Sequence, residues 1–171
     1  MPINEDTIRA YQQLVNSKAD AKSPEILPNA GKKHAAIAMA KLLEKTTHSA
    51  KMVVGSFSGD VCDQPNYLES LQKSIDRNVE FKIIFLDQRN TDATSYKMLL
   101  EAQKAGKNIQ FKDSSISFKN QLSTDGKPKH FAIFDDNKFR FETDTEKFIA
   151  WFSFNDEANA KKLSRVFYAA F

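Results

Sequence analysis

The stretch that decides the fold is residues 51–86. It opens with Lys51-Met52-Val53-Val54-Gly55-Ser56-Phe57 and closes with Val79-Glu80-Phe81-Lys82-Ile83-Ile84-Phe85-Leu86. Both ends are apolar runs of strand length, and residues 64–77 between them carry leucine and isoleucine at helical spacing. A strand, a helix and a second strand in this order predict two parallel strands joined by a crossover helix.

The same alternation continues on both sides of this stretch. Residues 34–45 and 91–105 are predicted helices, and residues 109–112 are a third short strand. From residue 115 the pattern changes to strand-like segments at 115–118, 130–134, 138–141 and 149–154, followed by a helix at 156–170. Asp135-Asp136-Asn137 is typical of a tight hairpin turn. The sequence therefore predicts an α/β fold with a mixed sheet, parallel strands first and antiparallel strands last, and helices on both faces.

The N-terminal segment reads differently from the rest. Residues 4–15 are predicted to form a short helix, and a linker with Pro24, Pro28 and Gly31 follows it. We therefore divide the chain into an N-terminal helix and linker, residues 1–30, and an α/β domain, residues 31–171.

The composition fits one well-packed domain. The chain has 171 residues, of which 41% are hydrophobic and 27% charged, and its net charge is +3. A mildly basic balance permits a nucleic acid or phosphorylated partner without marking a dedicated polyanion binder. The single cysteine excludes an internal disulfide, and no apolar run is long enough to cross a bilayer. No signal-peptide pattern opens the chain, so we expect a cytoplasmic protein with no membrane association.

Polar residues flank two of the late strands. His130 and Asp135 lie on either side of one, and Ser153 and Asn155 follow another. We expect these side chains to meet at one end of the sheet and to form a pocket for an anion. Each has an ordinary alternative: His130 as an exposed residue, Asp135 as a turn former, and Ser153 or Asn155 as the cap of the last helix.

Cationic residues gather near the same part of the chain. Arg140 and Glu142 alternate with Phe139 and Phe141, which indicates that they share one face of a strand. Such a pair is usually a surface ion pair, but if His130 lies on that face, Arg140 is the best candidate phosphate binder. Lysines surround the same region, namely Lys119, Lys127, Lys129 and Lys138. We count Lys129 among the phosphate-binding candidates.

The order of elements, the loop at Gly55-Ser56-Phe57 and the late Ser153-Phe154-Asn155 together resemble one half-unit of the phospholipase D superfamily over most of residues 31–171. The signature of that family is a His, one residue, a Lys, four residues and an Asp, followed downstream by Gly-Ser-x-Asn. Matching Asp135 to the Asp places His130 on the Lys position and Pro128 on the catalytic His position, so the motif is degenerate. Ser153 and Asn155 then match the Ser-x-Asn.

A second register is open. It places His130 on the catalytic His position, but then Ala132 falls on the Lys position and Asn137 on the Asp position. This register loses two groups where the first loses one, so we prefer the first.

The resemblance implies a chemistry that needs no metal or cofactor. A His attacks phosphorus, Lys and Asn bind phosphate oxygens, and a second His from another half-unit protonates the leaving oxygen, so a homodimer is expected. Three functions follow as hypotheses. The first is an eroded site that binds a phosphodiester or nucleic acid, or serves as a dimeric scaffold. The second is an active metal-independent phosphodiesterase or nuclease using His130. The third is a non-enzymatic protein-interaction module.

Other candidate sites are weaker. His34 and His48 have no acidic or thiol companion at metal-ligand spacing, so we expect no zinc site. The loop from Gly55 to Gly59 lacks the ending of a P-loop, yet its backbone amides could face an anion.

Overall fold

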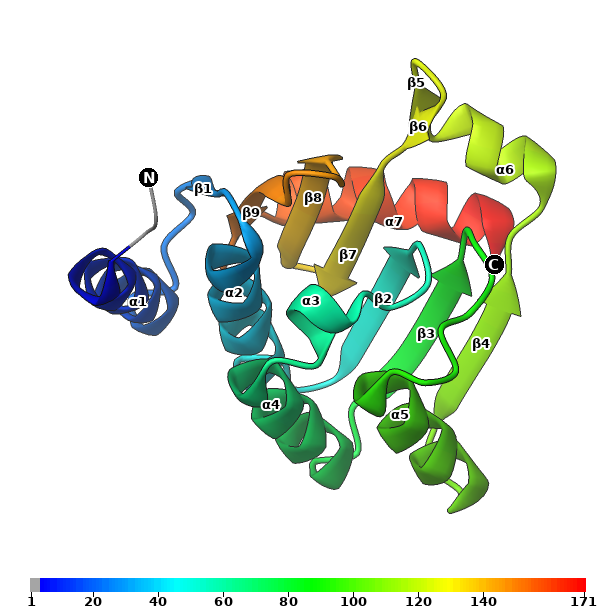
Figure 1. The fold of residues 1–171 in the computed structure, drawn as a ribbon, viewed down its shortest axis with the longest axis horizontal. Coiled ribbons are helices and arrows are strands. Elements are labelled where there is room, and N and C mark those ends of the chain that lie inside the picture. The colour runs from blue at the N-terminus through cyan, green and yellow to red at the C-terminus, as the bar shows by residue number, and fades with distance from the viewer. Residues whose placement is uncertain (1–3) are drawn as a thin grey trace.

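The computed structural model describes residues 4–171 and forms one layered α/β unit (Figure 1). Its helices are α1 Glu5–Asp20, α2 Lys32–Glu44, α3 Gly59–Cys62, α4 Pro65–Asp76, α5 Thr94–Lys104, α6 Ile116–Gln121 and α7 Glu157–Ala170. Its strands are β1 Leu27–Asn29, β2 Ser49–Val54, β3 Glu80–Phe85, β4 Ile109–Asp113, β5 Ser123–Thr124, β6 Lys127–Pro128, β7 His130–Phe134, β8 Lys138–Asp144 and β9 Ile149–Ser153.

Seven strands form the main sheet, in the order β1-β9-β8-β7-β2-β3-β4, and β5 and β6 form a separate small hairpin. The first three long strands, β2, β3 and β4, run parallel, whereas β7, β8, β9 and β1 pair antiparallel. The mixed sheet predicted from the sequence is thereby confirmed. Neighbours on opposite sides of β2 come from different parts of the chain, so the strand order reverses at β2.

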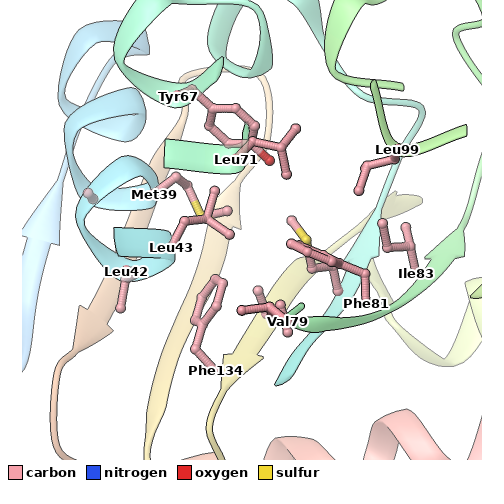
Figure 2. Close-up of a cluster of buried hydrophobic side chains, with 14 of the residues drawn as sticks. Met39, Leu42, Leu43, Tyr67, Leu71, Val79, Phe81, Ile83, Leu99 and Phe134 are labelled. Atoms are coloured by element: carbon pink, nitrogen blue, oxygen red, sulfur yellow. The ribbon is translucent and has the colours of Figure 1, made fainter. Parts of the chain in front are cut away.

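Successive residues of each strand bury opposite faces of the sheet. Met52 packs in the larger cluster under α2, α4 and α5, while Val53 packs in the cluster under α7. Figure 2 shows part of the larger cluster. Met39 and Leu43 of α2 and Tyr67 and Leu71 of α4 lie on the side of the sheet that carries Phe81 and Phe134. Helices therefore cover both faces, as expected.

Two segments differ from the prediction. Residues 115–118, expected as a strand, begin helix α6, because the Ser115 hydroxyl accepts from the Phe118 amide as an N-cap and only Phe118 is buried there. The expected linker after residue 15 is also shorter than predicted. Helix α1 continues to Asp20, and Leu27–Asn29 form the edge strand β1, which pairs with β9. Residues 27–29, expected to lie in the linker, are thus part of the sheet.

Candidate functional site

A cavity of about 380 Å³ opens at one end of the sheet, where β2 and β3 end and β7 begins. In Figure 1 this is the upper end of the sheet, below the β5–β6 hairpin. Its lining includes Gly55 and the polar residues Asp87, Lys127, His130, Arg140 and Glu142. Residues such as Val61, Tyr67 and Phe148 form its apolar walls. We call it the His130 pocket. Ligand sites in α/β sheets form outside the carboxyl ends of strands where the strand order reverses, which is the position of this pocket.

Three side chains form a chain of contacts in the pocket. His130 and Glu142 are cross-strand partners on β7 and β8, and the imidazole Nδ1 lies 3.3 Å from Glu142 Oε1. Glu142 Oε2 accepts a 2.7 Å hydrogen bond from Arg140 Nη2. One carboxylate therefore holds both an imidazole and a guanidinium. Glu142 is buried, with 6% of its surface exposed, and Arg140 is 8% exposed.

The electrostatics of Glu142 favour its ionised form. Burial by itself raises the pKa of this carboxyl, but the hydrogen bond with His130 and the charge of Arg140 outweigh burial and lower the pKa below its ordinary value. Glu142 is thus a fixed negative charge, and it favours a proton on the facing Nδ1 of His130.

Arg140 is positioned by β1 as well as by Glu142. Its Nε donates a 3.1 Å hydrogen bond to the side-chain oxygen of Asn29, and Asn29 in turn donates to the Phe148 carbonyl. Across the strand pair, Arg140 faces Ala132. The small Ala132 side chain leaves room for the guanidinium on that face. Arg140 lines the pocket, and its Nη1 makes none of the hydrogen bonds found among residues 4–171.

Two polar side chains, Asp87 and His130, lie close to the backbone of Gly55. A methyl group placed at Gly55 would lie 3.1 Å from Asp87 Oδ2 and 3.3 Å from His130 Nε2. The backbone of Gly55 is outside the left-handed region, so crowding is the reason for a glycine here. The imidazole therefore presents Nε2 toward the loop after β2 while Nδ1 faces Glu142.

Lysines at the rim of the pocket are paired with carboxylates. Lys119 pairs with Asp87, and Lys127 Nζ lies 3.1 Å from Glu146 Oε2. Lys129, predicted as a phosphate binder, donates a 2.6 Å hydrogen bond to the Thr143 carbonyl and is not part of the lining.

The other predicted site residues lie at the opposite end of the sheet. Asp135 follows the last residue of β7, five residues from His130, which is about 16 Å along an extended strand. Ser153 pairs with Phe139 near the start of β8, and Asn155 follows it. The expectation that all these groups meet in one pocket is therefore wrong. Residues that precede a strand and residues that follow it lie at opposite ends of the strand and are separated by its full length.

Each of these residues has a structural partner where it lies. The Asp135 carboxylate accepts hydrogen bonds from the backbone amides of Thr47, His48 and Ser49. Asp135 and Asp136 both have positive φ, of 54° and 60°, as the predicted hairpin turn requires.

Ser153 and Asn155 also contact groups away from the pocket. The Ser153 hydroxyl accepts from the Asn155 amide, and the Asn155 side chain donates to the Lys22 carbonyl. Neither caps α7, because Asp156 is its N-cap. This ordinary alternative for the two residues was therefore also wrong.

Sequence patterns gave little sign of Glu142 and Asp87, which line the pocket, or of Asn29, which holds Arg140 there. Glu142 was considered only as the ion-pair partner of Arg140, although its two-residue spacing from Arg140 on the strand did place both on one face. Asn29 and Asp87 carried no signal, because only the pairing of distant strands brings Asn29 to Arg140 and Asp87 to the pocket.

Within residues 4–171, no three His, Cys, Asp or Glu side chains gather in an arrangement that could hold a metal ion. None of the helices described is long and apolar enough to cross a membrane.

Comparison with known proteins identifies the fold. No protein-family model and no curated protein sequence matches the chain. Among solved structures, TrmBL2, described as an archaeal chromatin protein with a novel mode of DNA binding, aligns with a TM-score of 0.60 at 15% identity. The alignment covers 96% of this chain and 60% of the TrmBL2 chain, so the chain spans less than two thirds of that structure.

Two further structures are covered almost completely. Nuc from Salmonella typhimurium, a phospholipase D family member, aligns with a TM-score of 0.57 at 15% identity over 85% of this chain and 93% of its own. NucT from Helicobacter pylori aligns with a TM-score of 0.54 at 12% identity over 85% and 95%. The chain therefore has the phospholipase D-like fold that the sequence resemblance implied.

Proposed function

We propose that the His130 pocket binds a phosphodiester group of a nucleic acid. The observation that carries the proposal is the orientation of His130, whose Nδ1 faces the buried Glu142 carboxylate while Nε2 lies beside Gly55 at the pocket. A histidine held in this way presents one nitrogen of fixed tautomer to a ligand. The fold shared with a phospholipase D family member and with a DNA-binding chromatin protein supports the same ligand class.

This geometry favours the second register for the family signature. In that register His130 occupies the catalytic His position and Ala132 the Lys position, so the phosphate-binding lysine is missing. Arg140 lies directly across from Ala132 and brings a guanidinium to the same face. We propose that Arg140 replaces the lost lysine from the neighbouring strand. Its planar fork suits phosphate oxygens, although part of it is already engaged by Glu142 and Asn29.

Other donors near the pocket support an anionic ligand. Ser56, Phe57 and Ser58 line it, and their backbone amides donate none of the hydrogen bonds found among residues 4–171. Lys127 at the rim is 60% exposed, and its partner Glu146 is 68% exposed. Exposed pairs of this kind contribute about 0–1 kcal/mol, so a phosphate group displaces them at little cost.

A second function, slow metal-independent cleavage, is favoured by the same open Nε2. In this step Nε2 bonds to phosphorus, and the ester P–O bond breaks. The leaving oxygen takes its proton from a second imidazole, and water then hydrolyses the P–N bond to release the phosphate product. His130 is the only histidine that lines the pocket among the residues described. Cleavage therefore requires the His130 of a second copy, and we propose a homodimer for it.

The binding proposal is tested by titrating a labelled single-stranded oligonucleotide and following its fluorescence anisotropy at several salt concentrations. We expect affinity to fall linearly with salt on logarithmic axes, as phosphate contacts require, and His130→Ala to weaken binding at least about fivefold. His48→Ala is the matched control, because His48 is an exposed histidine at the other end of β2. Affinity independent of salt, or equal losses in both variants, contradicts the proposal.

The cleavage proposal has its own assay. Product is followed in excess chelator for the wild type, for His130→Ala and for mixtures of the two. If two copies share one site, an excess of His130→Ala lowers the activity of each wild-type chain, because mixed dimers carry one imidazole. Equal rates for the wild type and His130→Ala would remove this function and leave binding.

A further inference from the structure

A second hollow adjoins the His130 pocket along the same edge of the sheet. It lies where β3 and β4 end, has a volume of about 590 Å³, and is lined by Asp87, Arg89, Asp113, Ser114 and Lys119 among others. We call it the β3–β4 groove. Asp87 lines both hollows. A ligand that fills the His130 pocket and extends past the Asp87 side chain therefore enters the groove.

Arg89 is held in one orientation in this groove. Its guanidinium carbon lies 4.9 Å from the ring centre of Phe85 and 5.4 Å from that of Phe111. Nε donates a 2.9 Å hydrogen bond to Asp113, and Nη1 lies 3.4 Å from the Tyr96 hydroxyl. Stacking and hydrogen bonds together fix the plane of the guanidinium. Nη2 makes none of the hydrogen bonds found among residues 4–171, so a donor of a pre-oriented cation is left for a ligand.

Both ion pairs of the groove are open to solvent. The side chains of Asp113 and Asp87 are 72% and 48% exposed, and their partners are Arg89 and Lys119. Exposed pairs contribute little to stability, so a phosphate group can replace either carboxylate. Lys119 is held by Asp87, the residue that the two hollows share, and so can reach a phosphate on either side.

The aromatic rings near Arg89 serve to orient it. Phe111 stacks on Tyr96 with a ring-centre distance of 5.6 Å, and the Arg89 guanidinium lies over the Phe111 ring. Arg89 and Lys119 are the cations that the groove offers to a phosphate beside the phosphodiester pocket.

We propose that the β3–β4 groove binds the phosphate adjacent to the one in the His130 pocket, so that the ligand is a polynucleotide with more than one phosphodiester. This inference rests on the proposed function of the His130 pocket and specifies its ligand. A lipid headgroup or an isolated phosphodiester fills the first hollow alone and gains nothing from Arg89.

The test compares two probes on the full chain, a dinucleotide with one phosphodiester and a thymidine oligonucleotide of about twelve residues, the upper part of the range of single-strand sites. We expect wild type to prefer the longer probe, and Arg89→Gln to reduce that preference about tenfold through loss of one charge-assisted contact. Lys119→Gln provides a second variant that leaves the aromatic packing intact. Lys104→Gln is the matched control, an exposed lysine at the end of α5 that removes one charge elsewhere.

The outcomes separate the two proposals. If wild type binds both probes with equal affinity, or if neither groove variant changes the preference, the groove is not a subsite while the phosphodiester pocket stands. If wild type binds none of the probes, the proposed function fails, and the inference falls with it. Thermal unfolding of each variant identifies a loss that comes from misfolding.

Discussion

Glu142 is the residue on which the His130 pocket depends most directly. It contacts His130 through one carboxylate oxygen and Arg140 through the other, and both contacts are largely removed from water. A neutral amide at this position keeps the shape but loses the negative charge that faces His130 and Arg140. Arg140 would then remain buried beside a neutral amide in place of a carboxylate.

We expect Glu142→Gln to lower the free energy of unfolding by about 2–4 kcal/mol, because removing one partner of a buried ion pair leaves the other uncompensated. Urea unfolding at neutral pH measures the change. Glu146→Gln is the control: Glu146 is an exposed partner of Lys127, and its loss should stay within about 0.5 kcal/mol. Similar values for the two variants would show that burial does not strengthen the Glu142 contacts.

At Asp135 the same reasoning gives a structural role and not a catalytic one. Three backbone amides before and at the start of β2 donate to its carboxylate, and Lys138 pairs with it. These contacts join the β7–β8 turn to the loop that enters β2. Asp135 therefore belongs to the stability of the hairpin, at the end of the sheet away from the pocket.

We expect Asp135→Asn to lower the free energy of unfolding by about 1–3 kcal/mol, because the hydrogen bonds from the backbone amides are weakened. Oligonucleotide affinity should remain unchanged. Asparagine tolerates the positive φ of 54°, so the turn itself is retained. Asp125→Asn is the control, since Asp125 also has a φ of 54° but is exposed. A large loss of affinity in Asp135→Asn without a loss of stability would return Asp135 to the binding site.

The loop after β2 can be tested at Gly55, where the backbone comes close to Asp87 and His130. Gly55→Ala places a methyl group within 3.1–3.3 Å of the Asp87 carboxylate and the His130 ring, so one of them must move by a few tenths of an ångström. We expect oligonucleotide affinity to fall roughly threefold to tenfold, because the groups that meet the ligand are displaced.

Gly59→Ala is a close control, because its methyl group would lie 3.6 Å from Asp63, an ordinary contact distance. Anisotropy titrations of both variants provide the measurement. Unchanged affinity in Gly55→Ala would mean that the close approach of Asp87 and His130 has no part in binding.

The molecule as a whole should lose stability in acid through a small number of carboxylates. The pKa values of Glu142 and Asp135 lie below their ordinary values of 4.5 and 3.8 in the folded protein. In both cases burial acts in the opposite direction and is outweighed, by His130 and Arg140 for Glu142 and by backbone amides for Asp135. A lowered folded-state pKa means that the unfolded chain binds protons more readily than the folded protein does. The stabilising contribution of each carboxylate is therefore complete above its ordinary pKa and is lost as pH falls toward the folded-state pKa.

We therefore expect the free energy of unfolding to decline from about pH 5 down to about pH 2, with a shallower decline in Glu142→Gln and in Asp135→Asn. Urea unfolding at a series of pH values measures this directly. A pH profile of Glu142→Gln that runs parallel to that of wild type would show that Glu142 keeps an ordinary pKa in the folded protein.

The order of helices and strands follows from the sequence, because it depends on local properties. Apolar runs such as residues 79–86, placed between helical patterns, indicate buried strands, and the short turn at Asp135-Asp136 makes β7 and β8 a hairpin. The mixed sheet and most element boundaries could be predicted from these patterns. Helix α6 could not, because its apolar spacing is too short to distinguish a strand from one and a half helical turns.

The membership of the pocket was decided only by the tertiary structure. His130 meets Glu142 because the hairpin register pairs them, and it lies beside Asp87 because β2 is hydrogen-bonded to β7 on one side and β3 on the other. Residues close in sequence, His130 and Asp135, are separated by the length of the strand between them. Residues far apart in sequence, Asn29 and Arg140, are brought into contact by edge pairing of β1. Strand direction and register arise from hydrogen bonds between distant segments, and local sequence patterns do not specify which ends of two strands will share an edge.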